Sequence, residues 1–192
     1  MDDSVIRAMQ RWPNVPAVYG WLRLNRRGDW LLDGERITHA QFRAFIGRNY
    51  LVDERGCWYF QNGPQRVFIA LDATPWIIRH RADGRLETHT EAEVTTVKAV
   101  YLDEDGRIVL DTEHGPGLLH DGDLDWAVDQ LTTESGEPAG VEALEQALIH
   151  LSGEDTGLYW QGAATMPVRR LDWDDMPGKL GFVREPVEES EA

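Results

Sequence analysis

Short runs in which apolar and polar residues alternate follow one another along most of the chain, with turn residues between them. Alternation with a period of two predicts strands that bury one face. The predicted strands are 19–25, 29–32, 50–53, 58–61, 67–71, 76–81, 85–90, 94–102, 107–111 and 157–162. Tight turns join them, and Asp33-Gly34 is a strong hairpin signal. The pattern therefore predicts a series of antiparallel hairpins.

A short unit recurs within these hairpins: polar residues, Gly, one further residue, Trp and an apolar run. It occurs at 26–34 and at 54–63, and a degenerate copy without Trp lies at 103–110. Gly28 and Gly56 occupy equivalent positions in the first two copies. The 28-residue spacing predicts a repeated β unit, in which Trp30 and Trp58 anchor the core.

Four segments have the period of an α-helix instead. In the first, 3–12, we expect Val5, Ile6, Met9 and Trp12 to share one face and Pro13 and Pro16 to end the helix. The others are 39–47, with Thr38 as cap and Gln41 three residues on; 121–131, capped by Asp121 or Asp123; and a helix from Glu137-Pro138 with Val141, Leu144, Leu148 and Leu151 on one side. Gly115-Pro116-Gly117 is interpreted as a chain break, and 167–183 as irregular.

The fold class predicted from these elements is α+β, mainly antiparallel β-hairpins in two similar β-rich halves, with one early helix and two helices in the C-terminal half. We expect residues 1–90 to form an N-terminal β-rich half with an inserted helix. Residues 91–185 would form an acidic half with strands and two helices, and 186–192 a flexible acidic tail. The chain lacks an alternating strand–helix rhythm, which argues against a doubly wound fold or a barrel.

One stretch resembles an uncharacterised proteobacterial family of unknown function. The residues that carry the resemblance are Gly28-Asp29-Trp30, Gly34-Glu35-Arg36-Ile37, Tyr50-Leu51-Val52 and the strand from Gln65 that ends in Asp72-Ala73-Thr74-Pro75-Trp76-Ile77. The similarity covers roughly residues 20 to 130. It implies a β-rich protein of two similar halves, and a role in signalling without a defined ligand. It brings no catalytic residues.

Charge changes this picture because it is unevenly distributed along the 192 residues, whose formal net charge is −15. Residues 1–100 hold 14 Lys and Arg against 12 Asp and Glu, whereas residues 101–192 hold 5 against 22. A surface this acidic repels nucleic acid and anionic membranes. It suits a basic protein partner, simple solubility or, less simply, mimicry of DNA.

Other compositional features bear on the compartment. The single cysteine, Cys57, excludes an internal disulfide and a multi-cysteine metal site. The sequence lacks an apolar run of roughly 18 residues and an N-terminal signal peptide, so we expect a cytoplasmic protein.

Several motifs resemble functional sites, but each also has a structural interpretation. Gly56-Cys57-Trp58 resembles a papain-type nucleophile, yet strands surround it and we expect a buried, inert thiol. The carboxylates of 121–125 are spaced like a calcium loop, but a helix N-terminus enriched in Asp explains them. His114 and His120 flank a Gly-Pro-Gly segment beside carboxylates, so they form a candidate acid–base or metal cluster or are exposed loop residues.

Three hypotheses follow. The first is a non-enzymatic regulatory protein that binds a basic protein partner, without cofactor or metal. The second is a small-ligand-binding module with a cleft between the halves, lined by Trp58, Arg66, Trp76, Arg79 and Arg81. Paired arginines beside aromatic rings can hold a carboxylate or phosphate, although ion pairs with the excess Asp and Glu explain them equally. The third is a hydrolase that uses the region of His114 and His120.

Overall fold

The computed structural model describes residues 1–12 and 15–188 of the chain. These residues form two compact units. Unit 1 comprises Met1–Pro75 together with the chain from Gly181 onward, and unit 2 comprises Trp76–Leu180. Pro13, predicted to end the first helix, and 189–192 of the predicted tail lie outside the described residues.

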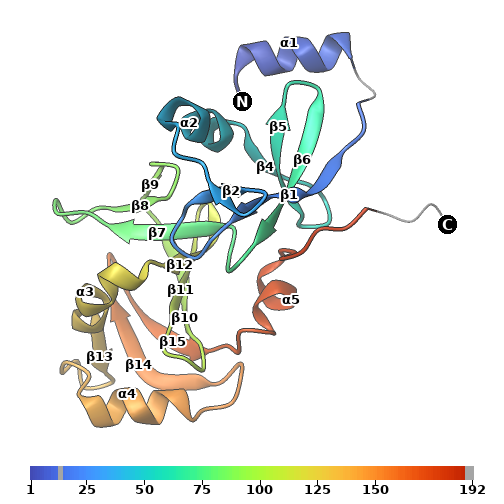
Figure 1. The fold of residues 1–192 in the computed structure, drawn as a ribbon. Coiled ribbons are helices and arrows are strands. Elements are labelled where there is room, and N and C mark those ends of the chain that lie inside the picture. The colour runs from blue at the N-terminus through green and yellow to red at the C-terminus, as the bar shows by residue number, and fades with distance from the viewer. Residues whose placement is uncertain (13–14, 189–192) are drawn as a thin grey trace. The chain divides into compact units, whose positions relative to one another are not determined.

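Unit 1 contains a six-stranded sheet with the strand order β3-β2-β1-β6-β5-β4 (Figure 1). Its elements are α1 (Asp3–Arg11), β1 (Val18–Leu24), β2 (Trp30–Leu32), β3 (Glu35–Arg36), α2 (Ala40–Arg48), β4 (Tyr50–Val52), β5 (Trp58–Asn62) and β6 (Gln65–Leu71). Neighbouring strands are antiparallel except for the central pair β1 and β6, which is parallel.

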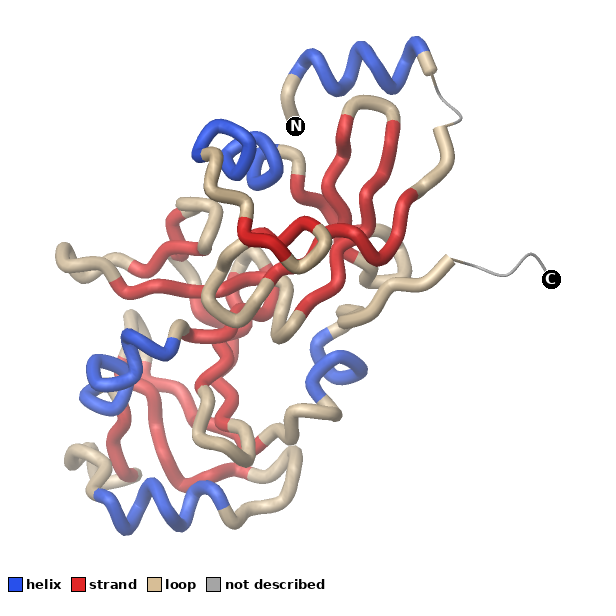
Figure 2. Tube along the Cα trace, in the orientation of Figure 1, coloured by secondary structure: helices blue, strands red, loops and turns tan. Residues whose placement is uncertain are grey.

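Unit 2 contains a nine-stranded sheet with the order β13-β14-β15-β10-β11-β12-β7-β8-β9. Strands are drawn in red in Figure 2. Its strands are β7 (Trp76–His80), β8 (Leu86–Thr88), β9 (Glu93–Val94), β10 (Val97–Leu102), β11 (Ile108–Thr112), β12 (Gly115–Leu119), β13 (Leu131–Thr133), β14 (Asp155–Gln161) and β15 (Thr165–Arg170). Its helices are the 3-10 turn η1 (Asp121–Asp123), α3 (Leu124–Asp129), α4 (Val141–Leu148) and α5 (Met176–Leu180). The pairs β7–β12 and β10–β15 are parallel.

The two units share one topology. The strands β9-β8-β7-β12-β11-β10 of unit 2 have the same order and directions as β3-β2-β1-β6-β5-β4 of unit 1. The predicted α+β fold with two similar β-rich halves is therefore confirmed. In unit 1 the helix α2 connects the third and fourth strands, whereas in unit 2 two residues make this connection. The strands β13–β15 extend only the second copy.

The recurring Gly unit of the sequence is a hairpin turn of five residues. In Asn25–Asp29, Asp53–Cys57, Arg81–Arg85 and Asp103–Arg107 the first N–H donates to the fifth carbonyl and the fourth N–H to the first carbonyl. The fourth residue is Gly with φ between 79° and 87° in all four turns, a left-handed conformation that favours Gly. This is the three-residue hairpin loop closed by a bulge.

This topology corrects the predicted 28-residue period. Gly28 lies in the β1–β2 turn and Gly56 in the β4–β5 turn, so these two positions belong to one copy of the fold. The equivalent of Gly28 in the second copy is Gly84, and the equivalent of Gly56 is Gly106. Gly28 and Gly56 lie in similar sequence units because each copy of the fold uses the same type of turn twice.

The predicted aromatic anchors lie in the core of unit 1. Trp30 is 2% exposed and contacts the ring of Tyr50 edge-on at 5.2 Å. Trp58 is 8% exposed and lies against the other side of this cluster, 4.6 Å from Tyr50 between ring centroids. Burial of such rings stabilises the fold by about 2–3 kcal/mol each. Cys57 is likewise buried, in a cluster with Tyr59 and Phe68.

The segment Gly115-Pro116-Gly117, predicted to break the chain, is instead the start of the central strand β12. Pro116 is tolerated because β7 begins opposite Gly117, so the missing N–H of Pro116 faces no β7 residue. Position 117 requires a glycine for packing, because a Cβ atom there would lie 2.5 Å from Cγ1 of Ile78. Close approach of the Ile78 side chain, rather than a turn, explains this glycine.

The predicted helices exist, but several boundaries and faces differ. The cap of α2 is His39, whose Nδ1 accepts the N–H of Phe42 at 3.2 Å, and not Thr38. In α1 only Val5 is buried, whereas Ile6 and Trp12 are 41% and 52% exposed. The predicted helix 121–131 is a 3-10 turn capped by His120, followed by α3, and Leu131 begins β13.

Two further regions depart from the sequence prediction. In α4 the predicted buried stripe is incomplete, because Val141 is 73% exposed and Leu151 lies beyond the helix and is 71% exposed. The region 167–183 is regular over much of its length, since it contains most of β15 and all of α5. The parallel partner of β15 is β10, which lies far away in the sequence, and no local pattern reveals that pairing.

Candidate functional site

Unit 2 contains a groove of about 680 Å³. The end of β7, the β7–β8 turn, the connection between β9 and β10, α3 and the β14–β15 turn contribute its walls. A groove of this size is typical of sites that bind a small molecule or several side chains of a partner.

The floor of the groove is a column of three rings. The imidazole of His80 lies flat on the indole of Trp126, with ring centroids 4.1 Å apart and an interplanar angle of 6°. Trp126 in turn contacts Trp160 edge-on, at 5.5 Å and 77°. Trp160 is 2% exposed and forms the buried base, while His80 and Trp126 are half-buried and line the open part.

The carboxylate of Asp123 positions this column. Its Oδ2 accepts the backbone N–H of His80 at 3.1 Å and Nε of Arg79 at 2.8 Å. Asp123 lies three residues before Trp126, at the start of α3. These bonds therefore connect the end of β7 to the first turn of α3 and place the indole against the imidazole.

Small residues keep the groove open on the opposite side. Gly162, Ala163 and Ala164 form the β14–β15 turn and are exposed. A Cβ atom on Gly162 would lie 3.1 Å from Nε1 of Trp160, so a larger residue would press on the indole. The two alanines place only methyl groups toward the opening.

The β9–β10 connection forms another wall of the groove, and the carboxylate of Glu113, which lies outside the groove, holds it in place. Glu113 accepts hydrogen bonds from N and Oγ1 of Thr95, at 2.6 and 2.7 Å, and from N of Thr96 at 3.2 Å. Burial raises the pKa of Glu113, but these hydrogen bonds outweigh it and lower the pKa to about 2. Because Thr95 and Thr96 line the groove, Glu113 fixes the β9–β10 connection there.

The surroundings of the groove are strongly acidic. Unit 2 holds 8 Lys and Arg against 22 Asp and Glu, a formal net charge of −14. Arg85 lines the groove, and its Nε and Nη2 bind Oδ2 of Asp83 at 2.9 and 2.7 Å. Glu93 is an exposed residue of the groove wall, and it raises the pKa of Arg85 to a smaller degree than Asp83 does.

The five residues predicted to line a cleft lie in different units. Trp58 and Arg66 belong to unit 1, where Trp58 is buried and the Arg66 guanidinium lies 5.0 Å from the Tyr59 ring centroid. Trp76 belongs to unit 2, where its Nε1 donates to the carbonyl of His114 at 2.7 Å.

The two predicted arginines of β7 form ion pairs. Arg79 binds Asp123, and Nε of Arg81 lies 3.2 Å from Glu87. Arg79 therefore supports the groove through Asp123 without lining it, and Trp76 likewise contributes no wall. The residues that sequence reasoning missed are Trp126, Trp160 and Glu93. Trp126 lies on a short acidic helix and Trp160 in a predicted strand, and the local pattern gives no sign that they meet.

The two candidate histidines lie at separate hydrogen-bonded turns. Nε2 of His114 contacts the carbonyl of Glu93 at 2.8 Å and is 3.9 Å from Glu113, beyond hydrogen-bond reach of that carboxylate. Nδ1 of His120 lies 3.0 Å from Asp121 but accepts the N–H of Gly122 at 2.9 Å. Since an accepting nitrogen carries no proton, this geometry favours a capping role for His120 over an ion pair.

His89, which lies beside Trp76, is held in its neutral form. Nδ1 of His89 accepts the N–H of Ile77 at 3.3 Å, and its ring lies 5.6 Å from that of Trp76. The residue retains some exposure, but its Nε2 is fully buried. Burial lowers the pKa of His89 to about 3.

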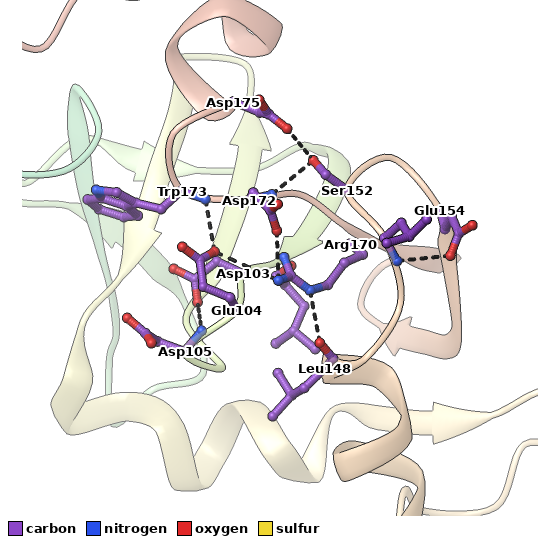
Figure 3. A network of polar contacts seen from close by, with 12 residues as sticks. Asp103, Glu104, Asp105, Leu148, Ser152, Glu154, Arg170, Asp172, Trp173 and Asp175 are labelled. Carbon is purple, nitrogen blue, oxygen red and sulfur yellow. Dashed lines mark hydrogen bonds and ion pairs between the residues drawn. The ribbon is translucent and has the colours of Figure 1, made fainter.

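A polar network lies elsewhere in unit 2, around the buried side chain of Arg170 (Figure 3). Nη1 of Arg170 donates to the carbonyl of Leu102 at 3.3 Å, Nε donates to that of Leu148 at 3.4 Å, and Nη2 lies 2.8 Å from Asp172. These contacts join the ends of β10, α4 and β15, so the primary effect of the network is to hold these elements together.

Ser152 in this network does not resemble a nucleophile. Its Oγ donates to Asp175 at 2.6 Å and accepts the N–H of Asp172 at 3.1 Å (Figure 3). Within the described residues its hydrogen-bond partners include neither an imidazole nor a lysine amine, the bases that usually activate a serine nucleophile. Nor do residues 1–12 and 15–188 contain a group of three His, Cys, Asp or Glu side chains placed to hold a metal ion. Among those residues, no helix is long and apolar enough to cross a bilayer.

Comparisons with known proteins agree with the fold. The model of the family DUF2944, described as "Protein of unknown function (DUF2946)", matches residues 1–187. A solved DUF1285 family protein from Silicibacter pomeroyi DSS-3 is 16% identical with a TM-score of 0.51, over 76% of this chain and 100% of that one. Another, from Shewanella baltica OS155, is 20% identical with a TM-score of 0.42, over 54% of this chain and 86% of that one.

The first of these structures supports the fold alone. No curated protein matches the chain. The resemblance to an uncharacterised proteobacterial family is confirmed.

Proposed function

The chain belongs to this family of proteins of unknown function, and we propose that it is a non-catalytic regulatory protein that binds a basic segment of a partner protein in the groove of unit 2. The observation that carries the proposal is the aromatic floor formed by His80, Trp126 and Trp160 inside a strongly acidic unit.

The shape of the groove supports binding of a partner side chain. Accessible aromatic rings held in place by packing provide binding energy at little cost in conformational entropy, and Trp is prominent among interface residues of high energy. His80 and Trp126 meet this condition, because Asp123 and the buried Trp160 restrict their positions.

The charge supports a basic partner. A formal net charge of −14 on unit 2 attracts cationic segments over a distance and speeds their association. Glu93 is an exposed residue of the groove wall, so its negative charge adds to this attraction. Arg85 offers little repulsion because Asp83 engages its guanidinium.

The experiment uses two labelled peptides, a tetrarepeat of Arg-Gly and a tetrarepeat of Glu-Gly, with the full chain. We expect the basic peptide to bind and the acidic peptide not to bind, as measured by fluorescence anisotropy. Ala163→Phe places a ring in the opening and should weaken binding of the basic peptide about tenfold or more. Ala82→Phe, in an exposed turn outside the groove, is the matched control and should bind like the unaltered chain.

Two results would contradict this function. One is that the basic peptide does not bind. The other is that it binds equally well to the Ala163→Phe and Ala82→Phe variants, because the binding surface then lies elsewhere.

The volume of the groove also favours a second candidate, the binding of a small molecule, since 680 Å³ is within the range of small-molecule sites. Native mass spectrometry of protein purified from producing cells tests it. A ligand mass that remains with the unaltered chain and is lost from Ala163→Phe supports this candidate. The absence of any such mass opposes it.

A further inference from the structure

A row of side chains that is buried in unit 1 lies open in the groove of unit 2. Counting from the first hairpin turn of each copy of the fold, Leu24 corresponds to His80 and Trp30 to Leu86. Leu24 and Trp30 face each other across β1 and β2, and they are 1% and 2% exposed. His80 and Leu86 face each other across β7 and β8, but both are half-buried and line the groove.

The row is covered in unit 1 by a helix and by a large ring. Phe45 of α2 contacts Phe60 edge-on at 5.3 Å. Phe60 pairs in register with Tyr50, and Tyr50 contacts Trp30, so α2 lies on the face of the sheet that carries Trp30. In unit 2, which the structure describes throughout, residues 95–96 make the equivalent connection without a helix, and they line the groove. Leucine in place of tryptophan opens the row further.

The open row is part of an apolar surface. Val94 pairs in register with Leu86, so the side chains of His80, Leu86 and Val94 lie on one face of the sheet. Met166 is half-buried, lines the same groove and pairs in register with Trp160. A methionine thioether adapts to the shape of a neighbouring group and makes favourable contacts with ring edges. The groove therefore offers apolar surface from both ends of the nine-stranded sheet.

We propose that this surface holds an aromatic side chain of the basic partner segment, which covers the row of unit 2 as Trp30 covers that of unit 1. An aromatic ring buries a large apolar area, and it packs with rings such as those of His80 and Trp126 in preferred geometries. The acidic charge of unit 2 attracts the basic residues on either side of this anchor. The anchor rests on the proposed function and adds the kind of side chain that the groove selects.

The test compares two labelled peptides of equal charge. Both are the tetrarepeat of Arg-Gly, with one central Gly replaced by Phe in the first and by Ala in the second. On the full chain we expect the Phe peptide to bind about tenfold more tightly in fluorescence anisotropy. Leu86→Thr keeps a residue that favours strands but removes apolar surface, and Met166→Gln makes a similar change on β15. Each should reduce the preference for Phe to about threefold or less.

Leu32→Thr is the matched control. Leu32 is a leucine of a short strand, β2 of unit 1, and it is 42% exposed and lies outside the groove. We expect this variant to retain both the affinity for each peptide and the preference for Phe. Circular dichroism on each variant establishes that the fold is kept before affinities are compared.

The outcomes separate the anchor from the proposed function. Equal binding of the two peptides, weakened by Ala163→Phe, would contradict the anchor and leave the basic-segment function standing. A preference for Phe that persists unchanged in both Leu86→Thr and Met166→Gln would also contradict the anchor. If neither peptide binds, the proposed function fails and the anchor fails with it.

Discussion

The carboxylate of Asp123 binds Nε of Arg79 at 2.8 Å, and the same oxygen accepts the N–H of His80 at 3.1 Å. A single oxygen thereby connects the last residues of β7 to the start of α3. The side chain of Asp123 is 10% exposed and that of Arg79 is 40% exposed, so the acceptor is shielded while the cation remains partly hydrated. The stack of His80 on Trp126 depends on this junction.

Substitution of Asp123 should loosen the ring column. Asp123→Asn weakens two hydrogen bonds, one of them charge-assisted, and we expect it to lower the free energy of unfolding by about 1–3 kcal/mol. Urea unfolding followed by Trp fluorescence measures this loss. Asp125→Asn, on the exposed side of α3, is the control and should change stability by less than about 0.5 kcal/mol. Equal stability of the two variants would show that Asp123 is not the junction.

The buried His89 should make the protein sensitive to mild acid. Its pKa is about 3 in the folded chain because burial disfavours the imidazolium, whereas the pKa of an unperturbed histidine is 6.5. As the pH falls below 6.5 the unfolded chain gains a proton that the folded chain does not. Stability therefore decreases, by at most about 1.4 kcal/mol per pH unit, until about pH 3. At higher pH the ring is neutral in both states and this effect is absent.

NMR titration tests this directly. The ring signals of His89 should remain in their neutral positions from pH 7 down to about 4. A titration of His89 centred above pH 6 would contradict the account, since the ring would then be hydrated rather than buried.

Gly117 should tolerate no side chain. A Cβ atom there would lie 2.5 Å from Cγ1 and 2.7 Å from Cδ1 of Ile78, inside two paired strands that cannot easily move apart. We expect Gly117→Ala to destabilise unit 2 by about 1–3 kcal/mol, as overpacking of a core does. Gly140→Ala is the control, because its φ is −75° and its added Cβ would have nothing within 4 Å. Equal melting temperatures for the two variants would contradict the packing argument.

Arg170 should be essential for the arrangement of β10, α4 and β15. Its side chain is 4% exposed. Removal of the guanidinium takes a hydrogen-bond donor from the carbonyls of Leu102 and Leu148 and an ion-pair partner from Asp172 (Figure 3). Arg170→Met should therefore cost about 2–4 kcal/mol, mainly because two backbone carbonyls lose a donor, whereas the carboxylate of Asp172 is 48% exposed and can be hydrated. Arg169→Met, on the exposed neighbour, should have little effect, and calorimetry compares the two. A small loss in Arg170→Met would mean that water replaces the guanidinium.

The hairpins were predictable because their determinants are local. A five-residue turn with Gly in fourth position needs only a left-handed residue there, and Asn25, Asp53 and Asp103 add a side-chain acceptor for the third and fifth N–H groups at 2.8–3.0 Å. These features are all readable in the sequence. The same local reasoning failed at Gly117, where the glycine serves the distant Ile78 and not a turn.

The larger arrangement was less accessible to sequence reasoning. The predicted boundary between the halves lies at 90/91, whereas the compact units divide after Pro75 and after Leu180. The reason is topological: β7 pairs in parallel with β12, some 40 residues later, so the chain from Trp76 belongs with the second sheet. Parallel pairing has no local signal, and periodicity could not supply this boundary.

The groove was missed for a similar reason. Its floor comes from β7, α3 and β14, which are separated by long stretches of chain. The sequence pointed to arginines and tryptophans, and Arg79 does support the groove through Asp123. It gave no means of choosing Trp126 and Trp160 from among eight tryptophans, because the choice depends on which elements meet in space.

Binding of a basic segment against the ring column of unit 2 can be followed by NMR on the indole N–H signals. The nitrogen-15-labelled chain is titrated with the tetrarepeat of Arg-Gly, with the signals assigned by single Trp→Phe variants. The signals of Trp126 and Trp160 should shift saturably, while those of Trp30 and Trp58 in the core of unit 1 remain in place. Unchanged Trp126 and Trp160 signals at saturating peptide would show that no basic segment binds there.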